Sequence, residues 1–506
     1  MERFDKLFVI CALTSLVGLS ACTDAADKDD TGEAADADTD TDTDTDTDTD
    51  TDTDTDTDTD TDTDTGPDRV LRAEVVQLSA TGGDVFYAVA FAPDGSFFAA
   101  GFVADTVEST TDRAMVVAKF TVDGDLDTTF GTAGVTRVNV AAGTTGESAR
   151  GVVVQSTGKI VIAGAVEHDV TATGTAASDR DIAVVRLNAD GTLDSGFGTG
   201  GILLLDLNTG IETLDSSGTA AWSGADAFWS LSLADADALV IHGATRAEGL
   251  QVDGETPRSD TDFALVRLTA NGAYDTTFGD GGVFTLDIEQ ANGSARNATV
   301  LPDGSILGGG YANTPTYGTV QPVLYKVTPA GVLDESFATD GLFHEEVLAE
   351  VAEIYAVTAV GDKLVTAGYG RSTTAESLDW LSLRFSAAGV LDTTWGDRGA
   401  VRVDYAGFTD NGRYITTLPD GNALIVGGAS TADSILDAAY GILLADGTLA
   451  GGAPVLHDFG GISDMLWSAA VAPDASFVAM VGLAGAGSGA TEAINDDAAI
   501  YLVPLE

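Results

Sequence analysis

The residues in this chain that could do acid–base or metal chemistry recur at fixed places. Five aspartates each stand three residues ahead of a Phe or Trp: Asp127, Asp194, Asp275, Asp334 and Asp392. Carboxylates that converge can act as a general acid and base, or can bind a hard cation such as calcium. A residue required in every repeat is more often part of the scaffold. We therefore expect each Asp to cap a turn and each aromatic side chain to fill a seam between repeats.

Other signals for catalysis are weak. The four histidines stand in different repeats without metal-ligand spacing: His168, His242, His344 and His457. The chain has no Gly-x-Ser-x-Gly motif and no phosphate-binding loop, and the acidic clusters at 123–127 and 235–237 lack the register of a calcium loop. We predict no catalytic residue, no metal ligand and no cofactor. Calcium binding stays open but has no motif to support it.

The elements that position these residues are repeats of about 60 residues. Segment 181–198 returns as segment 262–279, and looser copies end at Phe130, Phe337 and Trp395. Each repeat divides into four short strands, which in the clearest copy span 150–155, 159–166, 181–188 and 201–207. Their apolar runs are typical of strands buried on both faces, and Asp-Gly turns join the first strand to the second. Such units in series indicate an all-β fold, the β-propeller.

The two ends of the repeat region complement each other. Full blades are predicted at 84–140, 147–207, 222–288, 294–348, 352–406 and 411–461. The last unit, 463–506, has only three strands, and an additional strand at 73–79 precedes the first blade. We therefore predict a seven-bladed β-propeller of four-stranded blades, with the N-terminal strand completing the last blade. Closure of this kind removes an exposed sheet edge.

Three features of the repeats are shared with a known family. They are second strands in the style of Asp-Gly-Lys-Ile, the third strand Asp-Phe-Ala-Leu-Val-Arg-Leu at 262–268, and the hairpin Leu-Asp-x-x-Phe-Gly. In these features the region 69–506 resembles the bacterial delta-60 repeat family. The resemblance is strongest for the repeats ending at Phe130, Phe197 and Phe278. It implies a β-propeller and no established activity.

The N-terminus has the pattern of a lipoprotein signal peptide. Arg3 and Lys6 precede an apolar run at 7–19, which is too short to span a bilayer. The sequence Leu-Ser-Ala-Cys at 19–22 resembles the bacterial lipobox, which implies removal of 1–21 and acylation of Cys22. We predict a cell-envelope protein attached to the membrane through this lipid. Because Thr23 rather than Asp follows Cys22, we expect the outer membrane, with the side it faces left open.

The next segment, 22–68, is predicted to be a disordered acidic tether. It is dominated by Thr-Asp alternation, which offers no apolar face to bury. The formal net charge of the whole chain is −57, which argues against nucleic acid as a partner. The chain has two cysteines, and Cys11 would leave with the signal peptide, so no disulfide is expected. We expect a monomer.

Variable loops indicate where a ligand would bind. The long connections share one face of the predicted disc: 104–113, 166–181, 208–221, 246–262, 312–322, 370–379, 430–438 and 484–497. Within or beside them stand five candidate binding residues: Arg180, Arg246, Arg258, Tyr317 and Arg371. Loops on a rigid scaffold commonly carry binding sites.

Three functions remain open at this point. The pattern favours a lipid-anchored scaffold that binds a protein or glycan through its long-loop face. One alternative is a hydrolase or lyase with an acidic site at the central channel, where paired carboxylates could meet. The other is a purely structural envelope protein. Enzymatic activity is left uncertain, with a non-enzyme expected.

Overall fold

A computed structural model of the chain describes residues 71–79, 82–104, 113–141, 146–168, 179–214, 220–223, 226–251, 254–432, 435–460, 463–485 and 496–505. The chain divides into two units between Thr63 and Asp64, and every described residue belongs to the second. The predicted signal peptide with Cys22, the tether, and most of the loops 104–113, 166–181 and 484–497 lie outside the described residues. Among the residues that are described, no helix has the length and hydropathy needed to cross a membrane.

The regular secondary structure of the described residues is almost entirely β-strand, and the strands form mainly antiparallel sheets. The first sheet contains β2 (Asp84–Phe91), β3 (Phe97–Ala104), β4 (Arg113–Phe120) and β5 (Val135–Val138). The second contains β6 (Ser148–Val154), β7 (Ile160–Glu167), β8 (Arg180–Leu187) and β9 (Ile202–Leu205). The third contains β12 (Ala227–Leu233), β13 (Leu239–Arg246), β14 (Thr261–Leu268) and β15 (Val283–Leu286). A hairpin of β10 (Ile211–Leu214) and β11 (Ala220–Ser223) connects the second sheet to the third.

The second half of the propeller follows the same strand order. One sheet contains β24 (Asp410–Thr417), β25 (Ala423–Ala429), β26 (Asp437–Leu443) and β27 (Val455–His457). Another contains β28 (Met465–Val471), β29 (Phe477–Ala484), β30 (Asp497–Pro504) and the N-terminal β1 (Arg72–Val76). Eight further strands follow the third sheet in the chain and precede β24. They are β16 (Gly293–Val300), β17 (Ile306–Asn313), β18 (Val320–Val327), β19 (Leu342–Phe343), β20 (Val351–Val360), β21 (Lys363–Arg371), β22 (Asp379–Ser386) and β23 (Ala400–Val403).

The prediction of seven four-stranded blades is wrong. Among the described residues five sheets have four strands, and β16 to β23 form a single eight-stranded sheet. The two halves of that sheet join where Val320 of β18 pairs in parallel with Val351 of β20. The physical reason is the shortness of β19, which pairs only with Leu324 and Tyr325. The start of β18 is thus left with an open edge, and the next strand along the chain fills it.

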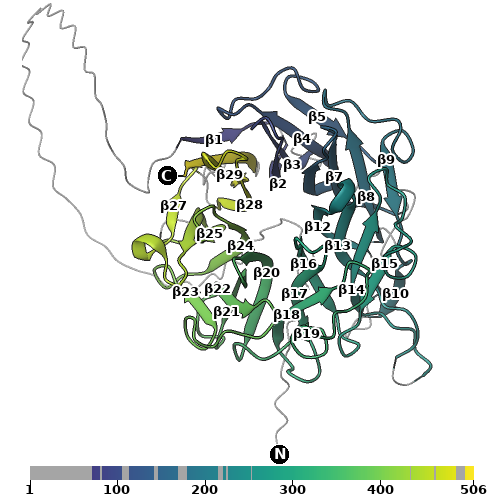
Figure 1. Cartoon of the computed structure of the whole chain (residues 1–506), viewed down its shortest axis with the longest axis vertical. Helices are drawn as coiled ribbons and strands as arrows, with labels where there is room; N and C mark the ends of the chain where they lie inside the picture. Colours follow the sequence, from purple (N-terminus) through teal and green to yellow (C-terminus); the bar gives the residue numbers. More distant parts are fainter. Residues whose placement is uncertain are drawn as a thin grey trace, which may run out of the picture. The chain divides into compact units, whose positions relative to one another are not determined.

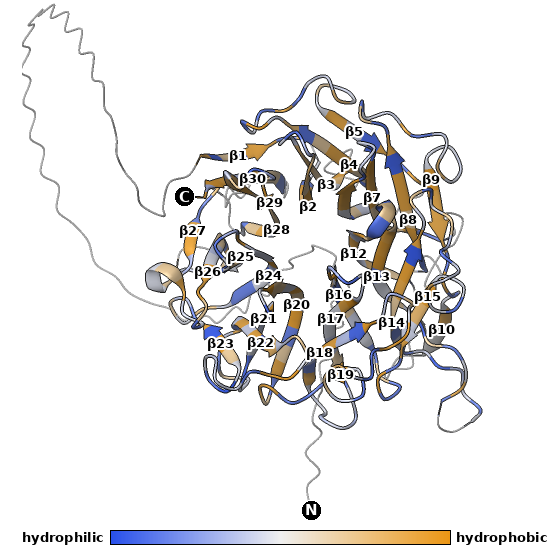
Figure 2. Ribbon diagram, viewed as in Figure 1, coloured by the Kyte–Doolittle hydropathy of each residue, from blue (hydrophilic) through white to orange (hydrophobic). Residues whose placement is uncertain are grey.

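The predicted all-β propeller is confirmed. The sheets stand around a central axis, and the first strand of each set lies nearest to it (Figure 1). These innermost strands touch one another in sequence, from β2 through β6, β12, β16, β20 and β24 to β28, and β28 touches β2 again. Apolar residues dominate the strands, as the continuous apolar runs predict (Figure 2). The core is therefore a series of apolar layers between neighbouring sheets.

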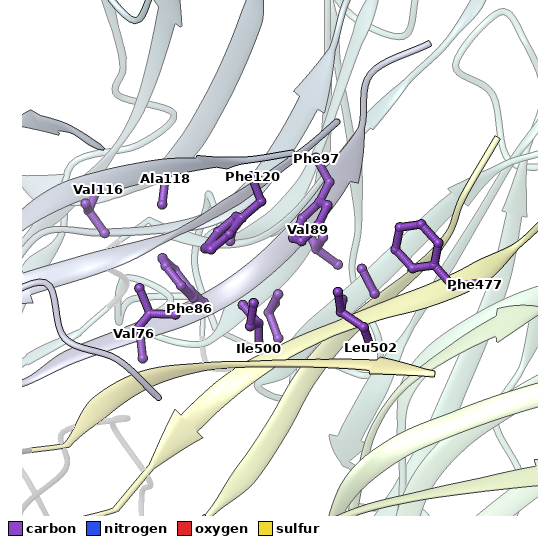
Figure 3. Packing of buried hydrophobic residues seen from close by; sticks show 14 of the residues in the cluster. Val76, Phe86, Val89, Phe97, Val116, Ala118, Phe120, Phe477, Ile500 and Leu502 are labelled. Carbon is purple, nitrogen blue, oxygen red and sulfur yellow. The ribbon is translucent and has the colours of Figure 1, made fainter. Parts of the chain in front are cut away.

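The pairing of the N-terminal strand with the last three strands is also confirmed. β1 runs antiparallel to β30, from the pair Arg72–Leu502 to the pair Val76–Ala498. Figure 3 shows the apolar layer at this junction, where Val76 and Ile500 meet Phe86 and Phe120. β1 thus covers the edge that β30 would otherwise expose.

Neighbouring repeats lock together through the repeated aromatic residue. Phe197 has no exposed surface and lies under the third-to-fourth-strand hairpin of the next repeat. A Cβ atom on Gly272 of that hairpin would stand 2.6 Å from Phe197 Cε2. The same fit pairs Gly389 with Phe337, and Gly447 with Trp395. The predicted seam role of the aromatic residues is confirmed.

The repeated Asp caps its turn, as predicted, and has a cationic partner that the sequence did not reveal. Asp275 Oδ1 accepts a hydrogen bond from Thr277 N at 3.0 Å, and Asp275 Oδ2 accepts one from Arg267 Nε at 2.8 Å. The guanidinium of Arg267 lies 4.6 Å from the ring centroid of Phe278 and donates to the Pro329 carbonyl of the next repeat at 2.5 Å. Arg186 and Arg384 make equivalent contacts in their own repeats.

We predict that the seam tolerates no side chain at Gly272. Gly272 and Gly158 both have positive φ, +81° and +77°, but nothing lies within 4 Å of a Cβ built on Gly158. Gly158→Ala should cost only about 1–2 kcal/mol for the left-handed backbone, whereas Gly272→Ala adds the clash with Phe197 and should cost at least ~2 kcal/mol more. Urea unfolding of both variants checks this. Equal losses of stability would contradict the interlock.

Candidate functional site

The predicted binding residues on the long-loop face hold their own loops together. Arg246 donates to the Thr209 carbonyl at 2.8 Å and to Asn208 Oδ1 at 2.9 Å, which fastens the start of the 208–221 insertion to the end of β13. Arg246 Nη1 also reaches the Arg258 carbonyl at 3.4 Å, so these two candidates are neighbours. Arg180 begins β8 and donates to the Gly146 carbonyl at 2.5 Å.

Arg258 is buried among carboxylates. Its guanidinium contacts Asp260, Asp262 at 3.1 Å and Asp287 at 2.7 Å, and only 7% of the residue is exposed. These acids raise the pKa of Arg258, so its charge is permanent. The acidic partners use most of the donors of this side chain, which closes the loop from 246 to 262 onto the sheet.

The remaining two candidates lie in other parts of the long-loop face. Tyr317 donates a hydrogen bond to the His344 carbonyl at 2.9 Å and packs edge-on against the His344 ring. Arg371 ends β21, and its guanidinium lies 3.8 Å from Glu350. Within the described residues no direct contact joins Arg180, Tyr317 and Arg371 to one another. The structure therefore brings together only Arg246 and Arg258.

A ring of arginines and aromatic residues, which the sequence analysis missed, surrounds the axis. Each innermost strand contributes one residue, and the types alternate: Tyr87, Arg150, Trp229, Arg296, Tyr355, Arg413 and Trp467. We call these residues the axial ring. They line one cavity, which means that seven strands distant in sequence deliver their side chains to one place.

A β-bulge points each residue of the axial ring toward the axis. Every innermost strand shows a register shift at this residue, for example between Ala149 and Gly151 in β6 and between Gly412 and Tyr414 in β24. A bulge inserts an unpaired residue and redirects its side chain. Opposite each bulge the second strand carries a Gly. A Cβ on Gly164 would lie 1.7 Å from the Ser148 carbonyl oxygen, so only Gly permits the bulged backbone to approach.

The arginines of the axial ring stack on the aromatic side chains. The guanidinium of Arg296 lies over Trp229 at 3.9 Å from the ring centroid and over Tyr355 at 4.6 Å. Arg413 lies over Tyr355 at 4.6 Å, and Arg150 lies over Tyr87 at 4.3 Å. Cations prefer the electron-rich ring faces.

None of the three arginines of the axial ring forms an ion pair with a described residue, although Arg296 donates hydrogen bonds to the Ala295 carbonyl at 2.9 Å and to Tyr311 Oη at 2.6 Å. Arg150 makes neither a hydrogen bond nor an ion pair with any described residue, and the Nε atoms of Arg296 and Arg413 are buried without acceptors. Burial, together with the charges of Arg296 and Arg413, lowers the pKa of Arg150. The indole Nε1 of Trp467 is another buried donor without a partner. Unpaired buried donors of this kind cost free energy unless a ligand satisfies them.

One carboxylate lies behind the axial ring. Glu353 stands two residues before Tyr355 on β20 and is 8% exposed, and its Oε2 atom has no hydrogen-bond partner. Burial raises the pKa of Glu353 to about 7, while Arg296 opposes the rise. The hydroxyls of Tyr355 and Tyr369 lie 3.1 Å apart beside it. Glu353 is thus partly neutral near pH 7 and balances at most one of the three arginines.

The axial ring forms the floor of a cavity of about 320 Å³. The other lining residues follow the ring residues along the innermost strands, toward the tight turns that lead to the second strands. They are small, hydroxyl-bearing or aliphatic, and include Ser232, Thr299, Thr358 and Thr416. None of the described lining residues is Asp, Glu or His. The cavity therefore lacks the convergent carboxylates that the alternative of an acidic hydrolase or lyase requires.

The sequence contained a signal for this site. The same position of the first strand holds Tyr, Arg, Trp, Arg, Tyr, Arg and Trp in successive units, and a Gly recurs in the second strand of each. The alternation was missed because the Asp and the aromatic residue of the hairpin recur almost unchanged and therefore define the repeat. A position that changes between two chemical types is less visible than one that stays constant.

The histidines have local roles in the described structure. His242 is fully buried, accepts from Tyr325 Oη at 2.9 Å and donates through Nδ1 to the Arg296 carbonyl at 3.0 Å. Burial lowers the pKa of His242 to about 4, so this side chain is neutral. His168 lies 3.0 Å from Asp181.

Among the residues that the structure describes, three groups of side chains have carboxylate oxygen or imidazole nitrogen atoms close enough to share a cation. They are His168 with Asp181 and Asp206; Asp260 with Asp262 and Asp287; and Asp379 with Asp404 and Asp410. In the second group the buried Arg258 already contacts all three carboxylates, and in the third Arg402 contacts Asp379. An arginine thus supplies the balancing charge in these two places.

Buried carboxylates also fasten the connections between units. Asp226 accepts from Leu207 N and from Thr245 Oγ1, both at 2.6 Å, and Asp410 accepts from Tyr405 N at 2.7 Å. Asp84, the first residue of β2, and Glu147, which directly precedes β6, serve the same purpose. Burial raises the pKa of each of these four acids to about 7.

Parts of the chain match the model of one protein family, a domain of unknown function (DUF5122) beta-propeller, at residues 155–197, 256–278 and 301–337. The matched residues make up less than half of the chain, and they support a β-propeller repeat family. The delta-60 name and the lipoprotein signal stay predictions. No curated protein sequence matches this chain.

Several solved structures resemble the fold at low sequence identity. The polysaccharide lyase Uly1 shares 11% identity, with 84% of this chain and 91% of that chain covered and a TM-score of 0.47. A protein of unknown function from Dyadobacter fermentans shares 11% identity over 87% and 99%, with a TM-score of 0.45. A catalytically inactive virginiamycin B lyase from Staphylococcus aureus shares 9% identity over 86% and 99%, with a TM-score of 0.43. These proteins differ in activity, so the likeness does not indicate what this chain binds.

The buried carboxylates predict a stability that falls as the pH rises. Each of the four is easier to ionise in the unfolded chain, with an ordinary pKa near 4, than in the folded protein, where the pKa is about 7. Between these values the folded state binds more protons, so stability is greatest at the acidic end and is lost toward pH 7. Because one pKa unit corresponds to about 1.4 kcal/mol, each of these groups should contribute on the order of 1 kcal/mol or more to the loss.

Thermal unfolding between pH 4.5 and pH 7.5 measures this dependence. In Asp226→Asn the unfolding temperature should fall less steeply with pH, because one titrating group is gone. Asp190→Asn is the matched control, because Asp190 is an exposed turn cap whose pKa is lowered by its hydrogen bonds to Thr192. The unfolding temperature of Asp190→Asn should fall with pH as steeply as that of the parent protein. A flat pH profile for the parent would contradict the assignment.

Proposed function

We propose that this protein is a binding module of the cell envelope that takes a small anionic ligand at the axial ring. The observation that carries the proposal is the gathering of Arg150, Arg296 and Arg413 around one axis without a matching set of acids. Like charges that lie close together in a partly desolvated cavity repel each other. A bound anion would offset this electrostatic repulsion.

The cavity meets the other requirements of a small-molecule site. It is concave, its volume lies near the lower end of the range for such sites, and a few charged groups converge at one end of a largely neutral wall. The surrounding protein is strongly acidic, so an anion reaches the axial ring only if it is attracted locally. This arrangement favours small anions over large polyanions such as nucleic acid.

We retain the predicted location of the protein in the cell envelope. A lipid on Cys22 would attach the protein to a membrane, most simply the outer membrane, and 22–68 would serve as a tether. A monomer suffices, because one chain supplies every residue of the axial ring. No metal or cofactor is invoked.

Arginine removal tests the proposal. Arg150→Gln and Arg413→Gln should each weaken binding of inorganic sulfate at least about tenfold, since a hydrogen bond to a charged group contributes about 1.5–3 kcal/mol. Isothermal titration calorimetry at constant ionic strength, with chloride as the reference anion, is the measurement. Arg398→Gln is the matched control because the Arg398 side chain is 87% exposed.

Stability without ligand separates binding from a purely structural role. If the arginines serve the anion, Arg150→Gln should leave the ligand-free protein equally stable or more stable, because it relieves repulsion. If they mainly fill the channel through stacking, the same variant should lose about 1–2 kcal/mol. Destabilised variants together with no sulfate binding by the parent protein would refute the proposal.

The ionisation of Glu353 should make the affinity for sulfate depend on pH. As the pH rises from 6 to 8 its carboxylate ionises among Arg296, Arg413, Tyr311, Tyr355 and Tyr369, and the net positive charge at the axis falls. Affinity for sulfate, which does not titrate in this range, should therefore decrease with pH. In Glu353→Gln the affinity should be higher at pH 8 and nearly constant with pH. An unchanged pH profile in this variant would show that Glu353 does not act on the site.

A further inference from the structure

The three arginines surround the axis from different sides. Counting around the axial ring from β2, Arg150, Arg296 and Arg413 occupy the second, fourth and sixth of its seven positions. One aromatic residue separates Arg150 from Arg296 and Arg296 from Arg413, and two separate Arg413 from Arg150, so no two guanidinium groups stand side by side. A group on the axis would meet three cations approaching from three directions.

This arrangement distinguishes between classes of anion. A carboxylate has two oxygen atoms, and one guanidinium can satisfy both in a bidentate pair. A terminal phosphoryl or sulfuryl group has three oxygen atoms arranged around the bond to the rest of the molecule. Three guanidinium groups around one axis therefore match a tetrahedral ester better than a carboxylate.

We infer that the ligand is a phosphate monoester or sulfate ester of a small polar molecule, bound with its three terminal oxygens toward Arg150, Arg296 and Arg413. The inference rests on the proposed function and specifies its ligand. The donors without partners, which are those of Arg150, the Nε atoms of Arg296 and Arg413, and the indole of Trp467, are the groups that the ester oxygens would satisfy.

The wall of the cavity indicates the direction of the rest of the ligand. From the axial ring the cavity extends along the innermost strands toward their tight turns, and the described wall carries no charge. Hydroxyl groups of Ser232, Thr358 and Thr416 alternate there with aliphatic side chains. A neutral sugar fits such a wall, because it combines hydroxyl groups with apolar ring faces. The ester would enter with its anion first, from the face opposite the long loops.

Matched ligands test the class of anion. Glucose 6-phosphate, glucose 6-sulfate, glucuronate and glucose would be titrated into the full chain by calorimetry at constant ionic strength and pH 7.5. We expect at least one ester to bind at least ~tenfold more tightly than glucuronate, and glucose not to bind. A tighter phosphate ester identifies a phosphate ligand, and a tighter sulfate ester a sulfate ligand; either result supports the inference. Each should lose at least ~tenfold affinity in Arg150→Gln and in Arg413→Gln.

Other outcomes are equally decisive. Glucuronate binding as tightly as both esters would overturn the tetrahedral-ester inference while leaving an anion site in place. If neither the esters, glucuronate nor inorganic sulfate binds, the inference and the proposed function both fail. The parent protein and the Arg398→Gln control should give the same values in every arm.

A blocking substitution tests the direction of entry. Thr416 lies on the cavity wall between the axial ring and the turn after β24, so Thr416→Trp should weaken glucose ester binding at least ~tenfold while inorganic sulfate still binds. Asn313→Trp, at an exposed position where β17 ends on the long-loop face, is the control and should bind the esters normally. Normal ester binding by Thr416→Trp, or its loss in Asn313→Trp, would overturn the direction. Near-ultraviolet circular dichroism confirms that both variants are folded.

Discussion

The structure depends on the contact between one repeat and the next at the third-to-fourth-strand hairpin. There a guanidinium, a carboxylate and an aromatic ring act as one unit. Arg267 pairs with Asp275, lies over Phe278 and donates to a carbonyl of the following repeat. The hairpin glycine of that repeat, Gly331, leaves room for the backbone that follows the ring, because a Cβ there would stand 2.1 Å from Gly279 N. Because the contact combines a directional ion pair with close packing, it sets the angle between neighbouring sheets more narrowly than apolar burial alone would.

That angle decides what happens on the axis. The innermost strands come close enough for side chains from every unit to meet, and small errors in the seam would add up around the ring. The β-bulges then turn one residue per strand inward, with a Gly such as Gly164 opposite to accept the bulged backbone. Outer seam and inner bulge are thus two parts of one arrangement. The seam fixes where the strands stand, and the bulge fixes where their side chains point.

The sequence predicted the parts of the fold that depend on constant residues. The Asp-Gly turns, the caps such as Asp275, the seam aromatics and the pairing of β1 with the last strands all follow from local chemistry or from a visible gap in the repeat. The number of separate sheets was predicted wrongly, because the union of β18 and β20 results from the length of β19 in space rather than from a motif. The candidate site could not be located in the same way. Its residues alternate in type, and their convergence depends on bulges that a strand pattern does not reveal.

The charge of the axial ring is the main argument that this site binds an anion. The protein carries a large excess of acid, and several of its arginines are paired with carboxylates, as Arg258 and Arg267 are. Arg150 and Arg413 form no ion pair with a described residue, although the chain has 80 acidic residues against 23 lysines and arginines. If these side chains served only to fill the channel, neutral residues of similar size would do so without the repulsion and desolvation that three guanidinium groups bring. Their presence on the axis, stacked and held in place by Trp229, Tyr355 and Trp467, is what a preorganised receptor for an anion requires.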